Sequence, residues 1–181
     1  SEPDRKVSSS GGAFSAFARY VLQQGGVVFG AAFDEELHCK HIEIQDIDGL
    51  APLRGSKYVQ SEIGDTFAQV RNHLRADRKV LFCGTPCQVA GLKNFLRKPY
   101  PNLLTLDLIC HGVPSDAVFQ GYLKKISSRF AADVEGYEFR NRDGWGFAPS
   151  VSVCGKFRRI YGVDALYMEA FNASAIFRKC C

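Results

Sequence analysis

Two thiols follow the ends of two consecutive apolar runs in this chain of 181 residues. Cys87 comes shortly after residues 80–82, and Cys110 directly follows residues 103–109. In an open α/β sheet, ligands bind beyond the carboxyl ends of parallel strands, and thiolates there can ligate metals or act as nucleophiles. Adjacent strands are about 4.8 Å apart. We therefore expect the side chains of Cys87 and Cys110 to lie within about 10 Å of each other at one sheet edge.

The residues before Cys87 predict the start of a helix. Thr85 suits the N-cap position, and Pro86 suits the first helical position. Cys87 would then lie in a first helical turn, where unpaired backbone N–H groups and the helix dipole favour anions such as thiolates. This position makes Cys87 a candidate catalytic residue.

A structural interpretation competes with a chemical one for every cysteine, because cysteine is often buried as a small apolar residue. The structural interpretation is favoured for Cys39, Cys83 and Cys154, each of which lies inside a strand-like run. Cys87 and Cys110 stand instead among Gly, Thr, Pro and His. The seven cysteines lack the spacing of a secreted disulfide framework, which favours free thiols or cluster ligands.

A run of small polar residues, Ser8-Ser9-Ser10-Gly11-Gly12, precedes a helical pattern. Hydroxyls, exposed backbone N–H groups and close backbone approach at a helix start are what a phosphate requires. The alternative is that Ser10 is only the N-cap of the helix. The run predicts a phosphate-binding loop.

A loop at 141–146 contains Arg142 and the single tryptophan, Trp145, and it follows Arg140. A cationic and aromatic surface of this kind suits a flat anionic ligand. The alternative is a solvated loop that Trp145 anchors to the core. Lys57, in the strand-like segment 55–61, indicates little by itself.

Composition places the chain among ordinary globular proteins, since 46% of its residues are hydrophobic. No apolar run reaches membrane-spanning length and no signal-peptide pattern occurs, so we expect a soluble cytoplasmic protein with no membrane partner. The net charge of +4 is spread along the chain. This distribution argues against nucleic acid as a partner and is compatible with a phosphorylated or polycarboxylate ligand.

Apolar periodicity predicts helices at 13–24, 63–75, from 85 onward, at 115–130 and at 164–173. The residues expected to face the core from the helix at 115–130 are Val118, Phe119, Tyr122 and Ile126. Strands are predicted at 80–84, 103–109 and 134–140, with hairpins at 27–45 and 150–161.

This order of elements predicts an α/β fold. We expect a mixed β-sheet with helices on both faces, a central parallel βαβ unit and flanking hairpins. Residues 1–181 are interpreted as a single domain. Because the chain opens on Ser1 without an initiator Met and stops on Cys180 and Cys181, we expect a fragment of a longer protein.

Five stretches of the chain resemble, in order, motifs of the beta-subunit family of coenzyme F420 hydrogenases and dehydrogenases. They are residues 9–14 (SSGGAF), 55–61 (GSKYVQS), 84–88 (GTPCQ), 109–114 (ICHGVP) and 139–146 (FRNRDGWG). Together they are far more specific than any one motif.

The resemblance implies an FAD-dependent iron–sulfur oxidoreductase built on an FAD-binding-type domain. Members of the family bind FAD, carry 4Fe-4S clusters and pass reducing equivalents between a deazaflavin (coenzyme F420) or another redox partner and the clusters. Ferredoxin or other redox subunits are the implied partners. A ferredoxin-like segment is expected before these residues and a cysteine-rich segment after them.

The resemblance also implies roles for individual residues. FAD would be contacted by Ser9, Ser10, Gly11, Gly12, Lys57 and Thr85, with Lys57 as a catalytic positive charge near the reduced isoalloxazine. Arg140 and Arg142 would meet the acidic tail of a deazaflavin. A cluster would be ligated by Cys87, Cys110 and Cys181. The Ser10–Gly12 loop and Lys57 would border the same cleft.

Two other classes of function remain open. One is a non-catalytic electron-transfer or scaffold subunit that keeps the fold. The other is a thiol enzyme with Cys87 as nucleophile and His111 as base. Flavin binding separates the leading interpretation from both, because a thiol enzyme would react with iodoacetamide near neutral pH and show no flavin spectrum.

Overall fold

The structure is a computed structural model that describes residues 8–141 and 148–181. The chain divides into two compact units. Unit 1 contains the residues up to 32 together with Lys40–Arg54 and Glu62–Cys110, and unit 2 contains Phe33–Cys39, Gly55–Ser61 and His111–Cys181. The expectation of a single FAD-binding-type domain stays a prediction.

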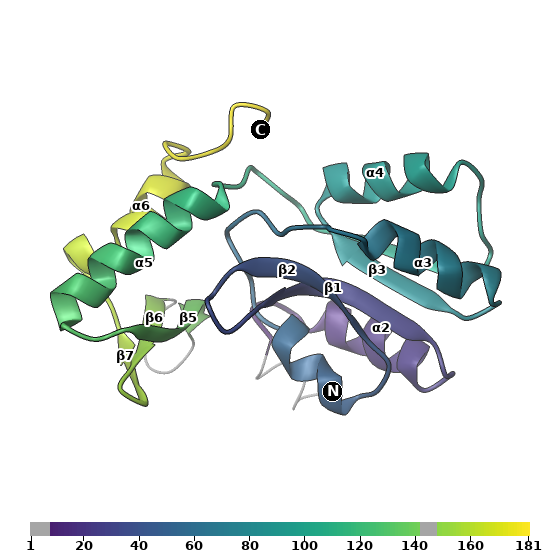
Figure 1. Ribbon diagram of the computed structural model, residues 1–181, viewed down its shortest axis with the longest axis horizontal. Coiled ribbons are helices and arrows are strands. Elements are labelled where there is room, and N and C mark those ends of the chain that lie inside the picture. The colour runs from purple at the N-terminus through teal and green to yellow at the C-terminus, as the bar shows by residue number, and fades with distance from the viewer. Residues whose placement is uncertain (1–7, 142–147) are drawn as a thin grey trace. The chain divides into compact units, whose positions relative to one another are not determined.

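Unit 1 is built on a four-stranded sheet with the strand order β2-β1-β3-β4 (Figure 1). The strands are β1 (Val27–Phe33), β2 (Cys39–Ile44), β3 (Val80–Gly84) and β4 (Leu103–Asp107). β3 lies between β1 and β4 and is parallel to both, and Val80 lies opposite Val27 and Leu103. β2 follows β1 after a short connection and pairs with it, so the sheet is mixed, as predicted.

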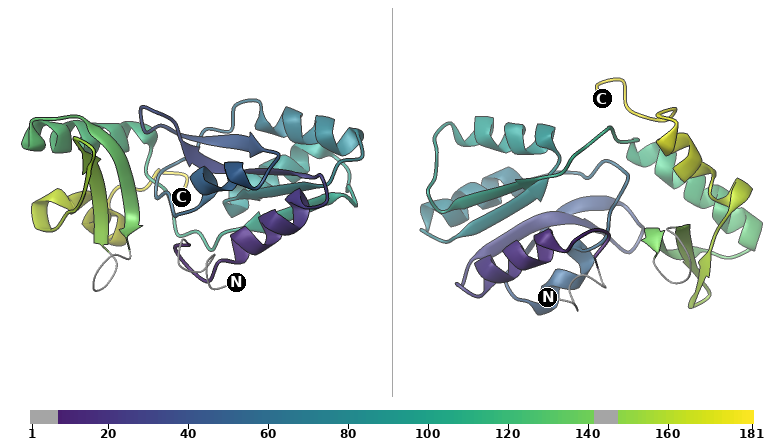
Figure 2. Two further views of the ribbon diagram at one scale, coloured as in Figure 1. Left: turned by 90° about the horizontal axis from the view of Figure 1, so that it is seen from below. Right: turned by 180° about the vertical axis from the view of Figure 1, so that it is seen from behind.

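Helices cover both faces of this sheet (Figure 2). Helix α2 (Ala13–Leu22) and the 3-10 helix η1 (Asp48–Leu53) pack on one face, and α3 (Thr66–Arg75) and α4 (Pro86–Leu96) pack on the other. Successive side chains along a strand point to opposite faces of the sheet, so a strand that is apolar throughout can be covered by helices on both faces. Val28 and Leu81 belong to the core beneath α2 and η1. The residues on either side of them in β1 and β3 belong to the core beneath α3 and α4; they are Val27, Phe29, Val80 and Phe82. The predicted parallel βαβ unit is thus confirmed as β3-α4-β4.

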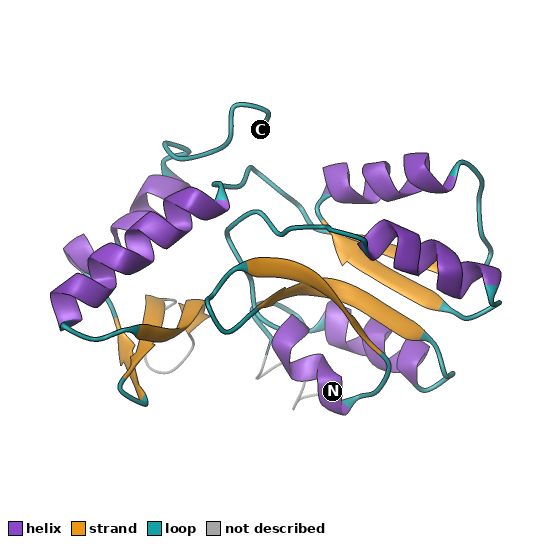
Figure 3. Cartoon of the chain, viewed as in Figure 1, coloured by secondary structure: helices purple, strands orange, loops and turns teal. Residues whose placement is uncertain are grey.

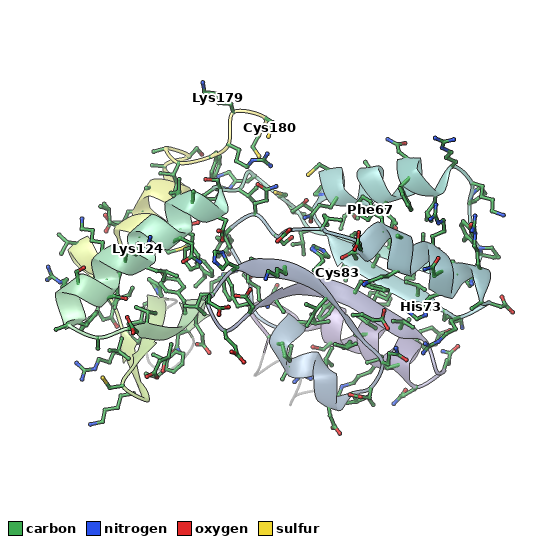
Figure 4. All side chains as sticks on the ribbon, viewed as in Figure 1. Phe67, His73, Cys83, Lys124, Lys179 and Cys180 are labelled. Carbon is green, nitrogen blue, oxygen red and sulfur yellow. The ribbon has the colours of Figure 1, made fainter. Side chains whose placement is uncertain are left out.

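The helix predicted at 63–75 is confirmed as α3, although it begins at Thr66. Ile63, Phe67, Val70 and Leu74 all belong to the core on the α3 and α4 side of the sheet. Phe67 lies between these helices, with its ring centroid 5.9 Å from that of Phe95 on α4 (Figure 4).

Unit 2 contains a three-stranded antiparallel sheet, with β6 between β5 and β7 (Figure 3). Its elements are α5 (Asp116–Phe130), β5 (Val134–Asn141), β6 (Ala148–Val153), β7 (Lys156–Arg159), the 3-10 helix η2 (Gly162–Asp164) and α6 (Leu166–Asn172). The core is aromatic. The ring of Phe119 on α5 lies 5.3 Å from those of Tyr137 and Tyr167 and 5.4 Å from that of Phe139.

The predicted hairpin around Gly155 is confirmed, but the interpretation of Cys154 as a buried strand residue is wrong. Cys154 (φ 50°) and Gly155 (φ 67°) form the two-residue turn between β6 and β7. Two successive residues with positive φ are what a tight hairpin turn requires, because that geometry matches the twist of the paired strands. Cys154 is therefore exposed.

The prediction that Val118 faces the core is also wrong. Phe119 is fully buried, whereas 40% of Val118 is exposed. Adjacent residues on a helix point about 100° apart. The orientation of α5 that buries Phe119 and Ile126 in the core therefore leaves Val118 partly exposed.

No helix within residues 8–141 and 148–181 is long and apolar enough to cross a membrane. The cytoplasmic location and the flanking segments stay predictions.

Candidate functional site

The carboxyl ends of β3 and β4 meet at one edge of the unit 1 sheet. Gly84, the last residue of β3, lies opposite Asp107, the last residue of β4. The backbone N–H of Leu108 donates to the carbonyl of Gly84 at 3.1 Å, which extends this alignment past the strand. The segments that carry Cys87 and Cys110 therefore leave the sheet at the same edge, where ligands bind in α/β folds.

Cys87 lies in the first turn of α4, as predicted. Thr85 is the N-cap and Pro86 opens the helix, and the carboxamide oxygen of Gln88 accepts a hydrogen bond from the backbone N–H of Thr85 at 2.9 Å. The thiol of Cys87 is exposed and lies 3.1 Å from the Thr85 hydroxyl. A capped helix of 11 residues thus presents a thiol at its positive end.

Cys110 is also exposed and stands three residues beyond β4. Cys110 and Cys87 therefore follow neighbouring parallel strands. Their expected separation of about 10 Å stays a prediction.

The Ser8–Gly12 run leads into α2, and its position follows from the connection to β1. Only residues 23–26 join α2 to β1, and α2 packs on the strand that follows it, so helix and strand run in opposite directions (Figure 1). The amino end of α2 therefore lies at the same sheet edge as the start of α4. Two helix N-termini, each attractive to anions, share this edge.

The N-cap of α2 is Gly12, with φ 86°, and not Ser10. A left-handed conformation at this position favours glycine. Ser10 and Gly11 are exposed, and a Cβ added to Gly11 would meet no atom within 4 Å. At Gly11 there is therefore room for close approach to the backbone just before a helix start, which suits a phosphate.

Arg54 lies beside this helix start and was not anticipated from the sequence. Its Nε donates to the hydroxyl of Ser15 in the first turn of α2 at 3.2 Å, and Ser15 is buried. The contact places a guanidinium beside the start of α2, where its charge would add to the positive end of the helix dipole. The two residues are 39 positions apart, so no local pattern could reveal the contact.

His41 on β2 was also not anticipated. Its Nε2 lies 3.0 Å from the carbonyl oxygen of Cys83, and its ring stacks on Phe82 at a centroid distance of 5.2 Å. Because a carbonyl only accepts, Nε2 carries the proton. Burial lowers the pKa of His41, so the neutral ring holds the end of β3 that precedes Thr85.

The cysteines do not assemble a metal centre within the described ranges. None of the seven cysteines, all of which lie in these ranges, forms a disulfide, and no three His, Cys, Asp or Glu side chains there are grouped so as to hold a metal ion. Burial raises the pKa of Cys39 to about 12, which makes Cys39 a poor thiolate ligand. The described residues alone therefore do not form a complete cluster site.

The remaining predicted site residues belong to unit 2, apart from Arg142, which lies outside the described residues. Lys57 is half-buried, and its ammonium donates to the carbonyl of Gly55 at 3.4 Å. Its charge partly offsets the effect of burial on the pKa of Cys39. Arg140 is half-buried on β5, and Cys181 is exposed.

His111 has aromatic surroundings in unit 2. Its ring lies edge-on to those of Phe171 and Phe177, at centroid distances of 5.4 and 4.9 Å, and its Nε2 lies 3.5 Å from the Ser174 hydroxyl. His111 is exposed, and none of these contacts involves Cys87, so its role as a base for Cys87 gains no support.

Comparison with known proteins adds to this geometry. The chain resembles in structure one chain of the xenon-derivatised F420-reducing [NiFe] hydrogenase complex from Methanosarcina barkeri, with a TM-score of 0.63 and 16% sequence identity. The match covers 99% of this chain and 61% of the other, so this chain spans less than two-thirds of that protein. At this identity the likeness shows the fold alone. No curated protein matches the chain.

Residues 77–176, more than half of the chain, match the family model that describes the C terminus of the coenzyme F420 hydrogenase/dehydrogenase beta subunit. This match includes β3, α4 and β4, which form the sheet edge that carries Cys87 and Cys110. The chain therefore belongs to the coenzyme F420 hydrogenase/dehydrogenase beta-subunit family.

Proposed function

We propose that this chain supplies the FAD-binding part of an iron–sulfur oxidoreductase. The full protein would pass reducing equivalents between a deazaflavin, coenzyme F420, or another redox partner and 4Fe-4S clusters. The observation that carries the proposal is the arrangement of residues at one edge of the unit 1 sheet. There an open glycine loop, the amino end of α2 and the Arg54 guanidinium come together.

FAD suits this edge because its pyrophosphate needs backbone donors and a positive field. Ser9, Ser10, Gly11 and Gly12 would hold the phosphates, with Arg54 as a charged donor. Thr85 would contact the cofactor from the second helix start. Bound FAD would accept a hydride as an electron pair and release the electrons singly, which links hydride carriers to one-electron centres.

Further roles extend this proposal. Lys57 would provide positive charge near the reduced flavin ring, and Arg140 and Arg142 would bind the acidic tail of a deazaflavin. Cys87, Cys110 and Cys181 would ligate iron together with ligands from elsewhere in the protein or its partners. The likeness to a chain of a multisubunit hydrogenase complex supports redox subunits as partners.

The test is a titration of the intact protein, purified without oxygen, with FAD. Saturable quenching of flavin fluorescence is expected, and Gly11→Asp should abolish it because a carboxylate would stand against the phosphates. Gly121→Asp is the matched control, since Gly121 also has open space around it and lies on α5.

Two results would contradict the proposal. One is the absence of any FAD binding to intact protein that still assembles with redox partners, which would favour the scaffold function. The other is equal loss of binding in both glycine variants, which would separate FAD binding from the loop.

A further inference from the structure

A cavity of about 450 Å³ opens in unit 1 between the last turns of α3 and α4. Its lining includes Arg71, Arg75, Phe95, Arg97, Lys98 and Tyr100. Four of these six side chains are cationic, and none of the residues around the cavity is acidic. Ligand pockets are commonly about 300–1,000 Å³ in volume, so the cavity has the size of a small-molecule site.

The cavity is separate from the candidate flavin site. Helix α4 begins at the sheet edge near Cys87 and is 11 residues long, and only residues of its last turn line the cavity. At 1.5 Å per residue, its ends are about 16 Å apart. The cavity therefore lies toward the opposite, amino end of the parallel strands.

Helix dipoles explain only some of these cations. Arg75 lies in the last turn of α3, and Arg97 and Lys98 follow the last turn of α4, where positive charge is favourable without any ligand. Arg71 lies in the middle of α3, so the dipole does not account for its place beside the cavity.

The surroundings of Arg71 point to a missing acceptor. Its guanidinium lies over the Phe95 ring at 4.7 Å, which orients the planar group. Its Nε is buried and has no hydrogen-bond partner within the described part of the chain. A buried donor without an acceptor is costly. An anion in the cavity would pair with the guanidinium through its nitrogens other than the buried Nε.

The other cations lack counter-charges as well. No described carboxylate pairs with Arg71, Arg75, Arg97 or Lys98. Lys98 instead lies over the Tyr100 ring at 5.0 Å. Like charges grouped around one concavity repel unless an anion enters it.

From this geometry we infer that the cavity binds a small organic polyanion with at least two phosphate or carboxylate groups. The guanidinium of Arg71 binds one group with its planar fork, and Arg75, Arg97 and Lys98 neutralise the second. Such a ligand would occupy the cavity without contacting the proposed flavin edge.

Calorimetry on the intact protein tests this inference with pyrophosphate and citrate as probes. We expect saturable binding of at least one probe that weakens as salt is raised. Arg71→Gln and Arg75→Gln should each weaken binding about tenfold, because each loses a charge-assisted contact. The probe that binds more tightly identifies the charged groups of the ligand as phosphate or as carboxylate.

Lys93→Gln is the matched control, since exposed Lys93 lies on α4 but does not line the cavity. Binding in this variant should equal that of the unmodified protein. Arg75 is exposed, so Arg75→Gln remains informative if Arg71→Gln does not fold. The inference is overturned if neither probe binds, if Lys93→Gln weakens binding equally, or if only a glutamate-rich peptide binds.

Discussion

The guanidinium of Arg54 donates to the hydroxyl of Ser15, which joins the end of η1 to the first turn of α2. This contact holds a positive charge beside the first turn of α2. A cation held at a helix N-terminus is the arrangement expected where a phosphate binds. The first prediction tests this contact directly.

Replacing Arg54 with glutamine should weaken FAD binding about tenfold, because one charge-assisted hydrogen bond is lost. Ser15→Ala should weaken it less, since the charge remains but its anchor does not. Fluorescence titration of the intact protein measures both effects. Lys124→Gln, which removes an exposed cation on α5 (Figure 4), should leave the affinity unchanged.

His41 predicts a pH dependence of stability. Burial lowers its pKa in the folded state, so the unfolded chain binds this proton more readily. The contribution of His41 is therefore fully present above about pH 6.5, the ordinary histidine pKa, and is lost as pH falls toward the folded value. Urea unfolding at several pH values should show this loss.

His41→Gln should flatten that dependence, whereas His111→Gln should not, since His111 is exposed. An unchanged pH profile in the His41 variant would contradict the assignment. The same variant loosens the end of β3, so it should also weaken FAD binding if the sheet edge is the flavin site.

The cysteines should differ in their reaction with iodoacetamide. Cys39 is buried and its pKa is raised to about 12, so it should stay unmodified near neutral pH in the native protein. Cys87, Cys110 and Cys154 are exposed and should be labelled, as peptide mass spectrometry can show.

The same labelling should be repeated on protein that is prepared without oxygen and has its cofactors bound. Cys87 and Cys110 should then be protected, and Cys154, at a hairpin turn, should react as before. Equal labelling of all three in cofactor-loaded protein would argue against a redox site at this sheet edge.

Gly26→Ala should destabilise unit 1. An added Cβ would lie 2.7 Å from the carbonyl oxygens of Val21 and Lys79, both of which are backbone atoms that cannot move freely. The expected loss in free energy of unfolding is roughly 1–3 kcal/mol, as for other overpacked sites. Gly121→Ala, in an open position on α5, should instead stabilise the protein by up to about 1 kcal/mol. Denaturant titration measures both.

Local signals in the amino-acid sequence were enough to predict most elements of the fold. The Thr85-Pro86 pair predicted the start of α4, apolar periodicity predicted α3, and the hairpin predicted at 150–161 is present as β6 and β7. Caps, periodicity and turn residues act over a few positions, so the chain carries this information without reference to its fold. The motifs also predicted the family, which the match at residues 77–176 confirms.

The residues that surround the sites depended on packing between distant segments. Arg54 reaches Ser15, His41 reaches Cys83, and Arg71 meets Phe95 only because sheet pairing and helix packing bring these segments together. Cys154 and Val118 show the same limit. Cys154 is exposed because it lies in a turn with positive φ, and Val118 is partly exposed because Phe119 occupies the core beside it. Such outcomes depend on which neighbours fill the available space, and one-dimensional spacing does not encode that competition.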